Sequence, residues 1–135
     1  MYLLDTNACI AIINRQPSRT RERFAAALAN GATMSVSLIT VFELWYGVAK
    51  SARREFNRRR VETFLAGPLD VLAMEEDDAR QAGTLRATLE RKGTPIGPYD
   101  LLIAGQALVR KATLVTTNAS EFARVPGLAR EDWTG

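Results

Sequence analysis

Short apolar runs alternate along the chain with longer segments in which apolar residues recur at helical spacing. The short runs are flanked by Gly, Pro or Asn and predict buried strands, whereas the longer segments predict helices. We expect strands over residues 2–4, 33–37, 70–73 and 112–116, with a last short strand near 127–128. We expect helices over residues 8–14, 18–29, 38–50, 52–65, 75–92 and 98–111, with a short one near 120–123. This alternation predicts an α/β fold, a three-layer α/β/α sandwich with a mainly parallel central sheet.

The composition is that of one soluble domain. Of the 135 residues, 47% are hydrophobic and 24% charged, so a single domain over residues 1–135 can fold around its own core. We expect no signal peptide, because no basic residue precedes Asp5. We expect no membrane span, because the longest uncharged stretch, 24–42, contains the turn signal Asn30-Gly31. We therefore expect a cytoplasmic protein, and its net charge of +3 is compatible with a nucleic-acid partner.

The chain contains no histidine and a single cysteine, Cys9. The lack of histidine excludes histidine as a catalytic acid or base, Ser-His-Asp and Cys-His triads, and histidine-ligated zinc. Cys9 lies in an apolar stretch, where we expect a small buried hydrophobic residue rather than a reactive thiol. Any catalysis must therefore use carboxylates, hydroxyls, lysine or arginine.

Four of the fifteen acids stand alone in stretches that otherwise resemble a protein interior. Each is the only charged residue of its stretch: Asp5 of 1–14, Glu43 of 33–49, Asp100 of 94–109 and Glu121 of 112–123. Burying an isolated carboxylate is costly unless it is protonated, paired with a base or given a cation. Because no base stands in any of these stretches, we predict a shared hard cation with oxygen ligands, Mg²⁺ or Mn²⁺.

Other acids have simpler explanations. Asp70 is also the only charge in its stretch, but it follows Gly67-Pro68, so a position in a turn or at the edge of the sheet accounts for it. The run Glu75-Glu76-Asp77-Asp78 opens a predicted helix, where acids suit the helix dipole. We expect this run on a solvated face.

The local sequence supports two of the four candidates. Asp100 falls in the first turn of a helix opened by a Gly-Pro pair, where free backbone N–H groups favour a carboxylate or a phosphate. Thr6 and Asn7 follow Asp5 and can cap the next helix and fix the rotamer of the carboxylate. Ligands of open α/β sheets bind beyond the carboxyl ends of the strands. Asp5 and residues 116–118 both follow a predicted strand.

Four motifs, in order along the chain, closely resemble those of the PIN-domain family. They are Leu3-Leu4-Asp5-Thr6-Asn7, Val41-Phe42-Glu43-Leu44-Trp45-Tyr46-Gly47, Gly97-Pro98-Tyr99-Asp100-Leu101-Leu102-Ile103-Ala104, and Val115-Thr116-Thr117-Asn118 with Glu121-Phe122. Within the family, the chain is similar to VapC-type toxins of bacterial toxin–antitoxin pairs, and the closing run 124–133 is similar to theirs as well. The resemblance covers essentially the whole chain.

The resemblance implies an endoribonuclease that depends on Mg²⁺ or Mn²⁺ and acts as a toxin. Asp5 and Asp100 would be the principal metal ligands, and Glu43 would complete the acidic pocket. The fourth position is open between Glu121, as the acid, and Asn118, with Thr116 as a further supporting group. Attack by a metal-activated water would leave a 5′-phosphate and a 3′-hydroxyl. The resemblance also implies an RNA substrate, with tRNA such as initiator tRNA suggested, a homodimer, and a small VapB-type antitoxin whose tail covers the site.

Basic and aromatic residues could hold RNA near this acidic pocket. Arg15, Arg19 and Arg23 are spaced for one helix face and are candidate phosphate contacts, with a solvated face as the simpler interpretation. Trp45 and Tyr46 could stack on bases, but packing in the core or in a dimer is the stronger expectation for both.

A non-catalytic PIN-like module that binds RNA or a protein is the alternative function. It is disfavoured because buried negative charge gives a phosphate-binding module no advantage. A haloacid-dehalogenase-like phosphatase needs a second acid two residues after Asp5, where Asn7 stands. A receiver domain needs a paired acid after its first strand and a lysine after its last, which the chain lacks.

Overall fold

The five strands form one parallel sheet at the centre of the molecule. The computed structural model describes residues 1–135, and the strands are β1 (Tyr2–Leu4), β2 (Met34–Ser37), β3 (Asp70–Leu72), β4 (Thr113–Val115) and β5 (Arg130–Glu131). Their order is β3-β2-β1-β4-β5, and every neighbouring pair is parallel. Leu4 of β1 is level with Val36 of β2 and Val115 of β4, so β1, β2 and β4 end together at one edge.

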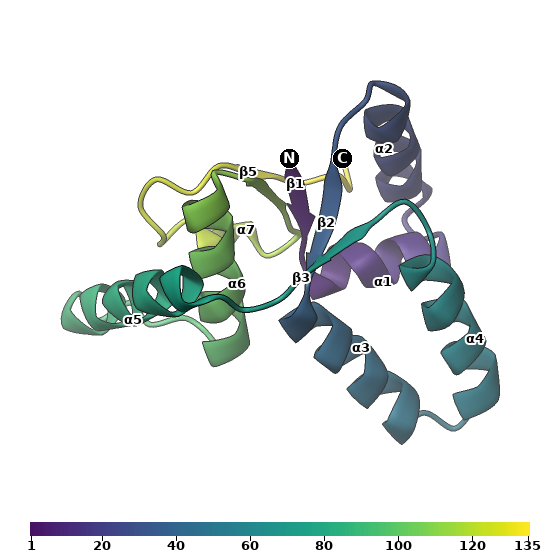
Figure 1. Ribbon diagram of the computed structural model, residues 1–135, viewed down its shortest axis with the longest axis horizontal. Coiled ribbons are helices and arrows are strands. Elements are labelled where there is room, and N and C mark those ends of the chain that lie inside the picture. The colour runs from purple at the N-terminus through teal and green to yellow at the C-terminus, as the bar shows by residue number, and fades with distance from the viewer.

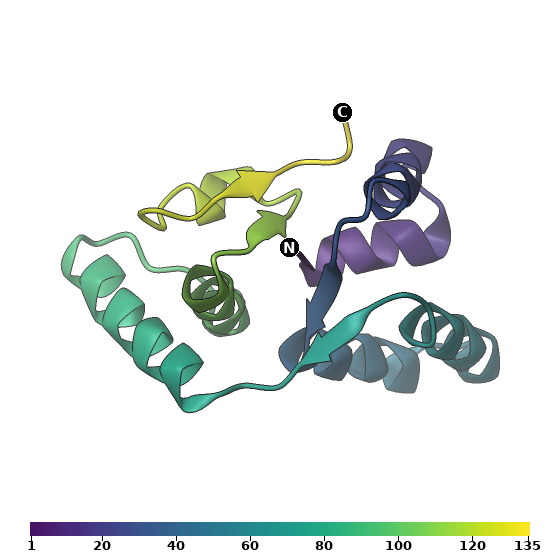
Figure 2. The same ribbon diagram turned by 45° about the horizontal axis from the view of Figure 1, so that its top comes forward.

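Helices cover both faces of this sheet. They are α1 (Thr6–Asn14), α2 (Ser18–Ala29), α3 (Leu38–Lys50), α4 (Arg54–Leu65), α5 (Glu76–Arg91), α6 (Pro98–Arg110) and α7 (Ala119–Phe122). The first four lie on one side, and α5, α6 and α7 lie on the other (Figures 1 and 2). The predicted three-layer α/β/α sandwich is therefore confirmed. None of the helices is both long and apolar enough to cross a membrane.

The alternation of side chains along β1 places a hydrophobic core on each face of the sheet. Leu3 packs with residues of α5, α6 and α7, whereas Leu4 packs with residues of α1, α3 and α4. Both leucines are fully buried, and burying such a side chain stabilises the fold by about 1.5–3 kcal/mol. A shift of one residue would exchange the two faces, so packing fixes the point where β1 ends and Asp5 begins.

The acid run at the start of α5 is only partly solvated. Glu75, Glu76 and Asp77 are exposed, as predicted, but Asp78 is fully buried. Its carboxylate accepts hydrogen bonds from the backbone N–H of Glu75 and from the guanidinium of Arg110 on α6. The prediction of a solvated face was therefore wrong for Asp78, because a cation on another helix compensates the buried charge.

Most element boundaries differ from the predictions by one to three residues, and two of them have a clear physical cause. The last strand covers 130–131 rather than 127–128, because Gly127 turns the chain with a φ of 76° and Leu128 packs into the core beside α5 and α6. The first helix begins at Thr6 rather than at residue 8, because the Asp5 side chain caps it. Packing and capping decide these ends, and a local pattern reports neither of them directly.

Two predictions about single residues are confirmed. Asp70 is exposed on β3, at the edge of the sheet. Cys9 is fully buried in the core on the α1 side, where burial raises the pKa of its thiol well above the ordinary value. Cys9 is therefore an unreactive core residue.

Candidate active site

Asp5 lies where β1 ends and α1 begins. Its carboxylate Oδ1 accepts the backbone N–H of Ala8 at 2.8 Å and so caps the helix. Asp5 is only 3% exposed. Burial raises the pKa of Asp5, hydrogen bonds from Thr116 and Ala8 oppose the rise, and the carboxylate of Glu43 adds to it. The chain therefore holds this carboxylate firmly without pairing it with a base.

Asp100 stands in the first turn of α6, just after Pro98. Its pKa is raised to about 6, chiefly by burial and then by the carboxylates of Glu121, Asp5 and Glu43, in that order. Because such repulsion is strong only at short range, the four predicted acids converge on one corner of the molecule. None of the four forms an ion pair with lysine or arginine. The corner is therefore a cluster of uncompensated negative charge at the carboxyl end of the sheet.

Glu43 reaches this corner from α3. Its Oε1 accepts the hydroxyl proton of Thr6 at 2.6 Å, and the Thr40 hydroxyl lies 3.3 Å from that of Thr6. Thr6 directly follows Asp5, so the first residues of α1 hold the carboxylate of Asp5 and orient that of Glu43. The prediction that Thr6 and Asn7 cap α1 was wrong, because Asp5 is itself the cap. The Asn7 side chain is exposed, and only its backbone N–H lowers the pKa of Asp5.

Glu121 of α7 and Asn118 together occupy the fourth position of the predicted site. Glu121 Oε1 accepts the backbone N–H of Gly97 at 2.6 Å, and its Oε2 accepts the side-chain amide of Asn118 at 2.6 Å. The backbone N–H of Asn118 in turn donates to the hydroxyl of Thr116 at 2.9 Å. In this geometry Glu121 supplies the negative charge, and Asn118 and Thr116 are hydrogen-bonding support.

The donor set suits a hard divalent cation. No three acidic side chains lie close enough to ligate one ion jointly, so a pair such as Asp5 and Asp100 would hold the ion with water completing its coordination. Mg²⁺ is commonly bound in this way. A cation would also relieve the burial and repulsion that raise the pKa of Asp100.

The three candidate arginines do not share one helix face. Arg15 ends α1 in a left-handed conformation, whereas Arg19 and Arg23 lie on α2. Arg23 contacts the C-terminal residues instead: its guanidinium lies 3.5 Å from a Glu131 carboxylate oxygen and over the ring of Trp133. The predicted common face was wrong because residues 16–17 separate the two helices, and only Arg15 and Arg19 are free of such contacts.

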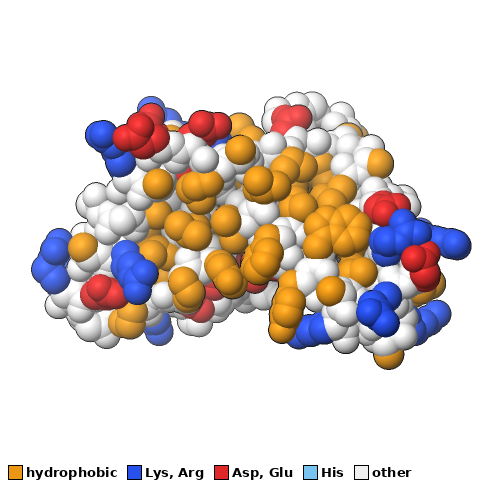
Figure 3. All heavy atoms as spheres, turned by 60° about the horizontal axis from the view of Figure 1, so that its bottom comes forward, with side chains coloured by type: hydrophobic (Ala, Val, Ile, Leu, Met, Phe, Trp, Pro, Cys, Tyr) orange, Lys and Arg blue, Asp and Glu red, His pale blue; other side chains and the backbone are white.

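An apolar face lies beside the acidic corner, on the outer side of α3. Leu38, Phe42 and Tyr46 recur every four residues along α3 and are about half exposed, and the ring of Phe42 packs edge-on against that of Tyr99 at 5.6 Å. Figure 3 shows hydrophobic side chains gathered across the middle of this side of the molecule, with charged side chains toward its edges. The four-residue spacing could have revealed this face. Trp45, by contrast, is partly buried and packs against the core that contains Leu4 and residues of α1, α3 and α4.

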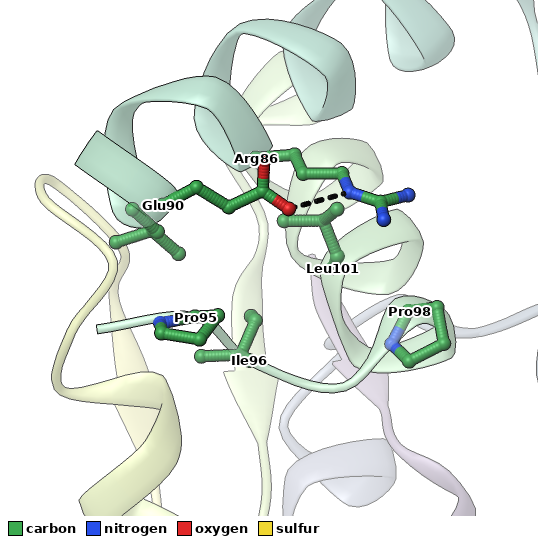
Figure 4. A pocket seen from close by; sticks show the side chains of 7 residues that line it. Arg86, Glu90, Pro95, Ile96, Pro98 and Leu101 are labelled. Atoms are coloured by element: carbon green, nitrogen blue, oxygen red, sulfur yellow. Dashed lines mark hydrogen bonds and ion pairs between the residues drawn. The ribbon is translucent and has the colours of Figure 1, made fainter. Parts of the chain in front are cut away.

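Two hollows lie outside the acidic corner. The larger, of about 1230 Å³, is a groove between α1, α2 and α4 with an apolar floor that includes Phe24, Leu28 and Phe64. Its rim carries five arginines and one acid: Arg15, Arg21, Arg53, Arg59, Arg60 and Glu55. The smaller, of about 180 Å³, lies between α5 and the segment that leads into α6 (Figure 4). The sequence did not predict the groove, because α4, which follows much later along the chain, packs beside α1 and α2 to build it.

Known proteins resemble this chain over nearly its whole length. Residues 2–128 match the family described as PIN domain. A tRNA(fMet)-specific endonuclease VapC of Salmonella typhimurium is 46% identical over 98% of this chain and 97% of its own length. Ribonuclease VapC2 of Rickettsia felis is 41% identical over 98% of both. The crystal structure of VapBC2 from Rickettsia felis, bound to a DNA fragment from its promoter, superposes with a TM-score of 0.91 at 39% identity and covers 98% of both chains.

The chain therefore belongs to the PIN domain family, within its VapC-type ribonucleases. The predicted resemblance is confirmed.

Proposed function

We propose that this protein is a metal-dependent endoribonuclease, the toxin of a toxin–antitoxin pair, and that it hydrolyses phosphodiester bonds of tRNA. The observation that carries the proposal is the convergence of four carboxylates without a base, with the pKa of Asp100 raised to about 6. A site that binds phosphate alone gains nothing from this charge, which argues against the non-catalytic module. A site that holds a cation needs the charge.

Asp5 and Asp100 would ligate Mg²⁺ or Mn²⁺, with Glu43 and Glu121 completing the negative site. The ion would supply a nucleophilic water at neutral pH and neutralise charge on the transferring phosphoryl group. Asp5 is preorganised for this role, because its bond to Ala8 fixes the carboxylate rotamer. Glu43 is oriented by the Thr6 hydroxyl and could accept a proton from the attacking water. Attack by water leaves a 5′-phosphate and a 3′-hydroxyl and needs no histidine.

Transfer RNA is the proposed substrate because a relative 46% identical is named for its action on tRNA(fMet). RNA must approach a negatively charged site, so cations around the site have to offset repulsion. Arg15 and Arg19 are the better candidates for phosphate contacts, since Arg23 is already bound by Glu131 and the Asp132 carbonyl. Initiator tRNA is the first RNA to test.

The proposed partner is a VapB-type antitoxin, since the structural neighbours are complexes of toxin and antitoxin. The groove between α1, α2 and α4 suits an amphipathic segment of such a partner. Its apolar floor would accept hydrophobic side chains, and its arginine rim would pair with acids. From there, a chain could continue along α1 toward Asp5.

A second copy of this chain is the proposed partner of the exposed face of α3. Leu38, Phe42 and Tyr46 are too large and too close together to be scattered surface residues. Homodimer formation would bury them next to the acidic corner, so two sites would share one surface.

Sequencing the RNA ends that form on brief expression of the protein tests the proposed function. We expect new ends bearing 5′-phosphates at defined positions of one or few tRNAs. Cells that express Asp100→Asn should lack these ends, and cells that express Glu76→Gln, which removes an exposed acid of α5, should contain them. Identical ends in the Asp100→Asn and wild-type cells would contradict the proposal.

A further inference from the structure

A series of hydrogen bonds runs from the start of α6 to Thr116, beside Asp5, by way of Glu121. At one end, Glu121 Oε1 accepts the N–H of Gly97, the residue that precedes α6, at 2.6 Å. At the other end, Glu121 Oε2 accepts the amide of Asn118 at 2.6 Å, and the N–H of Asn118 donates to the Thr116 hydroxyl at 2.9 Å. Thr116 lies beside Asp5, since its side chain lowers the pKa of the Asp5 carboxylate.

The Gly97 end of this series of hydrogen bonds determines where Asp100 lies. The carbonyl of Gly97 accepts the N–H of Leu101 at 2.9 Å, so Gly97 is bonded to α6 through its carbonyl and to Glu121 through its N–H. A residue in the first turn of a helix moves with the start of that helix. A shift of Gly97 would therefore move Asp100.

The segment that precedes Gly97 has few other restraints. Residues 94–97 are neither helix nor strand, and the cavity of about 180 Å³ separates part of this segment from Arg86 and Glu90 of α5 (Figure 4). At its start the segment is tied to α5, because the N–H of Thr94 donates to the carbonyl of Leu89 at 2.9 Å, and Ile96 packs against the core. Closer to α6 it is tied by Arg124, which donates to the carbonyl of Pro95 at 2.7 Å, and by Glu121. The last two ties come from α7 or the residues just after it, so this part of the protein helps to set the start of α6.

Both oxygens of Glu121 are thus engaged before any ion binds. These two short hydrogen bonds fix the position of the carboxylate and tie Gly97, the residue that precedes α6, to α7. We propose that Glu121 is a positioning residue, which grips Gly97 and Asn118 and thereby sets the separation between the carboxylates of Asp5 and Asp100. The part of Glu121 in catalysis rests on the proposed function, whereas its hydrogen bond with Gly97 does not.

Two substitutions of Glu121 separate the effect of its hydrogen bond with Gly97 from the effect of its charge. Glu121→Gln and Glu121→Ala both remove the negative charge, but glutamine keeps an oxygen for the N–H of Gly97 and alanine does not. The first readout is the amide hydrogen exchange of Gly97 in metal-free protein, followed by NMR. We expect Gly97 to be protected in the wild type and in Glu121→Gln, and to exchange at least about tenfold faster in Glu121→Ala.

The second readout is calorimetric titration of Mn²⁺ without RNA. We expect Glu121→Ala to bind Mn²⁺ roughly three- to tenfold more weakly than Glu121→Gln, because the two differ by one hydrogen bond and not by charge. Asn118→Ala keeps the charge of Glu121 and removes only its second support, so it should also weaken Mn²⁺ binding. Glu76→Gln, which removes a distant exposed acid, should leave both readouts unchanged.

Equal Mn²⁺ affinity in the two Glu121 variants, with Gly97 equally protected in both, would overturn the proposal and leave Glu121 a role through charge alone. If Glu121→Ala does not fold, Asn118→Ala decides: wild-type Mn²⁺ affinity in that variant overturns the proposal. A wild-type protein that cleaves no RNA would refute the proposed function, and the exchange of Gly97 would still report whether Glu121 holds the start of α6.

Discussion

The carboxylate of Asp5 raises the pKa of Asp100 through space, although the two residues lie far apart in the sequence. The end of the central strand presents Asp5, and the first turn of α6 presents Asp100. Neither residue has a lysine or arginine partner, so packing that stabilises the fold brings like charges together. The acidic corner is therefore an electrostatic cost that a divalent cation can relieve.

Asp5→Asn and Asp5→Ala separate the capping role of Asp5 from its charge. Asparagine keeps an oxygen for the N–H of Ala8, whereas alanine removes the cap of α1 at a cost of about 1 kcal/mol. We expect both variants to lose RNA cleavage and only Asp5→Ala to lose the cap energy, measured by urea unfolding of metal-free protein. A folded variant of either kind that cleaves RNA at the wild-type rate would contradict the assignment of Asp5.

Asp100→Asn should change the stability of the metal-free protein in a pH-dependent manner. The pKa of Asp100 is about 6 in the folded state, above its ordinary 3.8, so the folded state binds this proton more readily than the unfolded state does. The destabilisation by ionised Asp100 is therefore complete above pH 6 and disappears as the pH falls below 3.8. We expect Asp100→Asn to stabilise the protein by about 1 kcal/mol at pH 7, after allowance for solvent screening of a partly exposed group, and to have almost no effect near pH 3. Urea unfolding in EDTA at both pH values measures this difference, and an equal effect at the two would refute it.

Arg110→Ala should destabilise the pairing of α5 with α6. It leaves the fully buried carboxylate of Asp78 without its cation, and breaking such a pair costs about 3–5 kcal/mol. Arg80→Ala is the matched control, because it breaks an exposed ion pair with Glu76 and should cost less than about 1 kcal/mol. Similar losses for both variants in urea unfolding would mean that the buried pair contributes no more than a surface pair.

Phe42→Glu should convert a dimer to a monomer. The substitution places a charge at the centre of the exposed α3 face, where dimer formation would have to desolvate it. Val109→Glu adds the same charge at an exposed apolar residue near the far end of α6 and serves as the control. Analytical ultracentrifugation measures the outcome. A wild-type monomer, or a Phe42→Glu dimer, would contradict the proposed use of this face.

Isolation of a charge in an apolar stretch selected acids that the structure brings together, and the reason is physical. A lone acid such as Glu43 or Glu121 interrupts a buried segment, and the fold must compensate it somewhere. Parallel strands end at a common edge, so acids that follow strands or open helices come together there. The same reasoning could not place Asp78, because its compensating cation, Arg110, lies on another helix and the acid sits in a run of exposed charges.

Surfaces that several helices build together also could not be predicted from the local pattern of the sequence. Leu38 and Phe42 read as core residues, yet they are exposed, because only one side of α3 packs against the sheet. The arginine-rimmed groove combines residues as distant as Arg15 and Arg60, and nothing in either stretch predicts that they share a wall. Tertiary packing decides both features.

The central claim is that Asp5 and Asp100 hold a divalent cation with which this protein cleaves RNA. The most direct test is cleavage of an initiator tRNA transcript by purified, antitoxin-free protein, measured against Mg²⁺ concentration for the wild type and Asp100→Asn. We predict that wild-type cleavage rises with Mg²⁺, is abolished by EDTA and is restored by excess Mg²⁺ or Mn²⁺, while folded Asp100→Asn stays inactive at the concentrations that saturate the wild type. Cleavage that persists in EDTA, or that Asp100→Asn performs at the wild-type rate, would contradict the account.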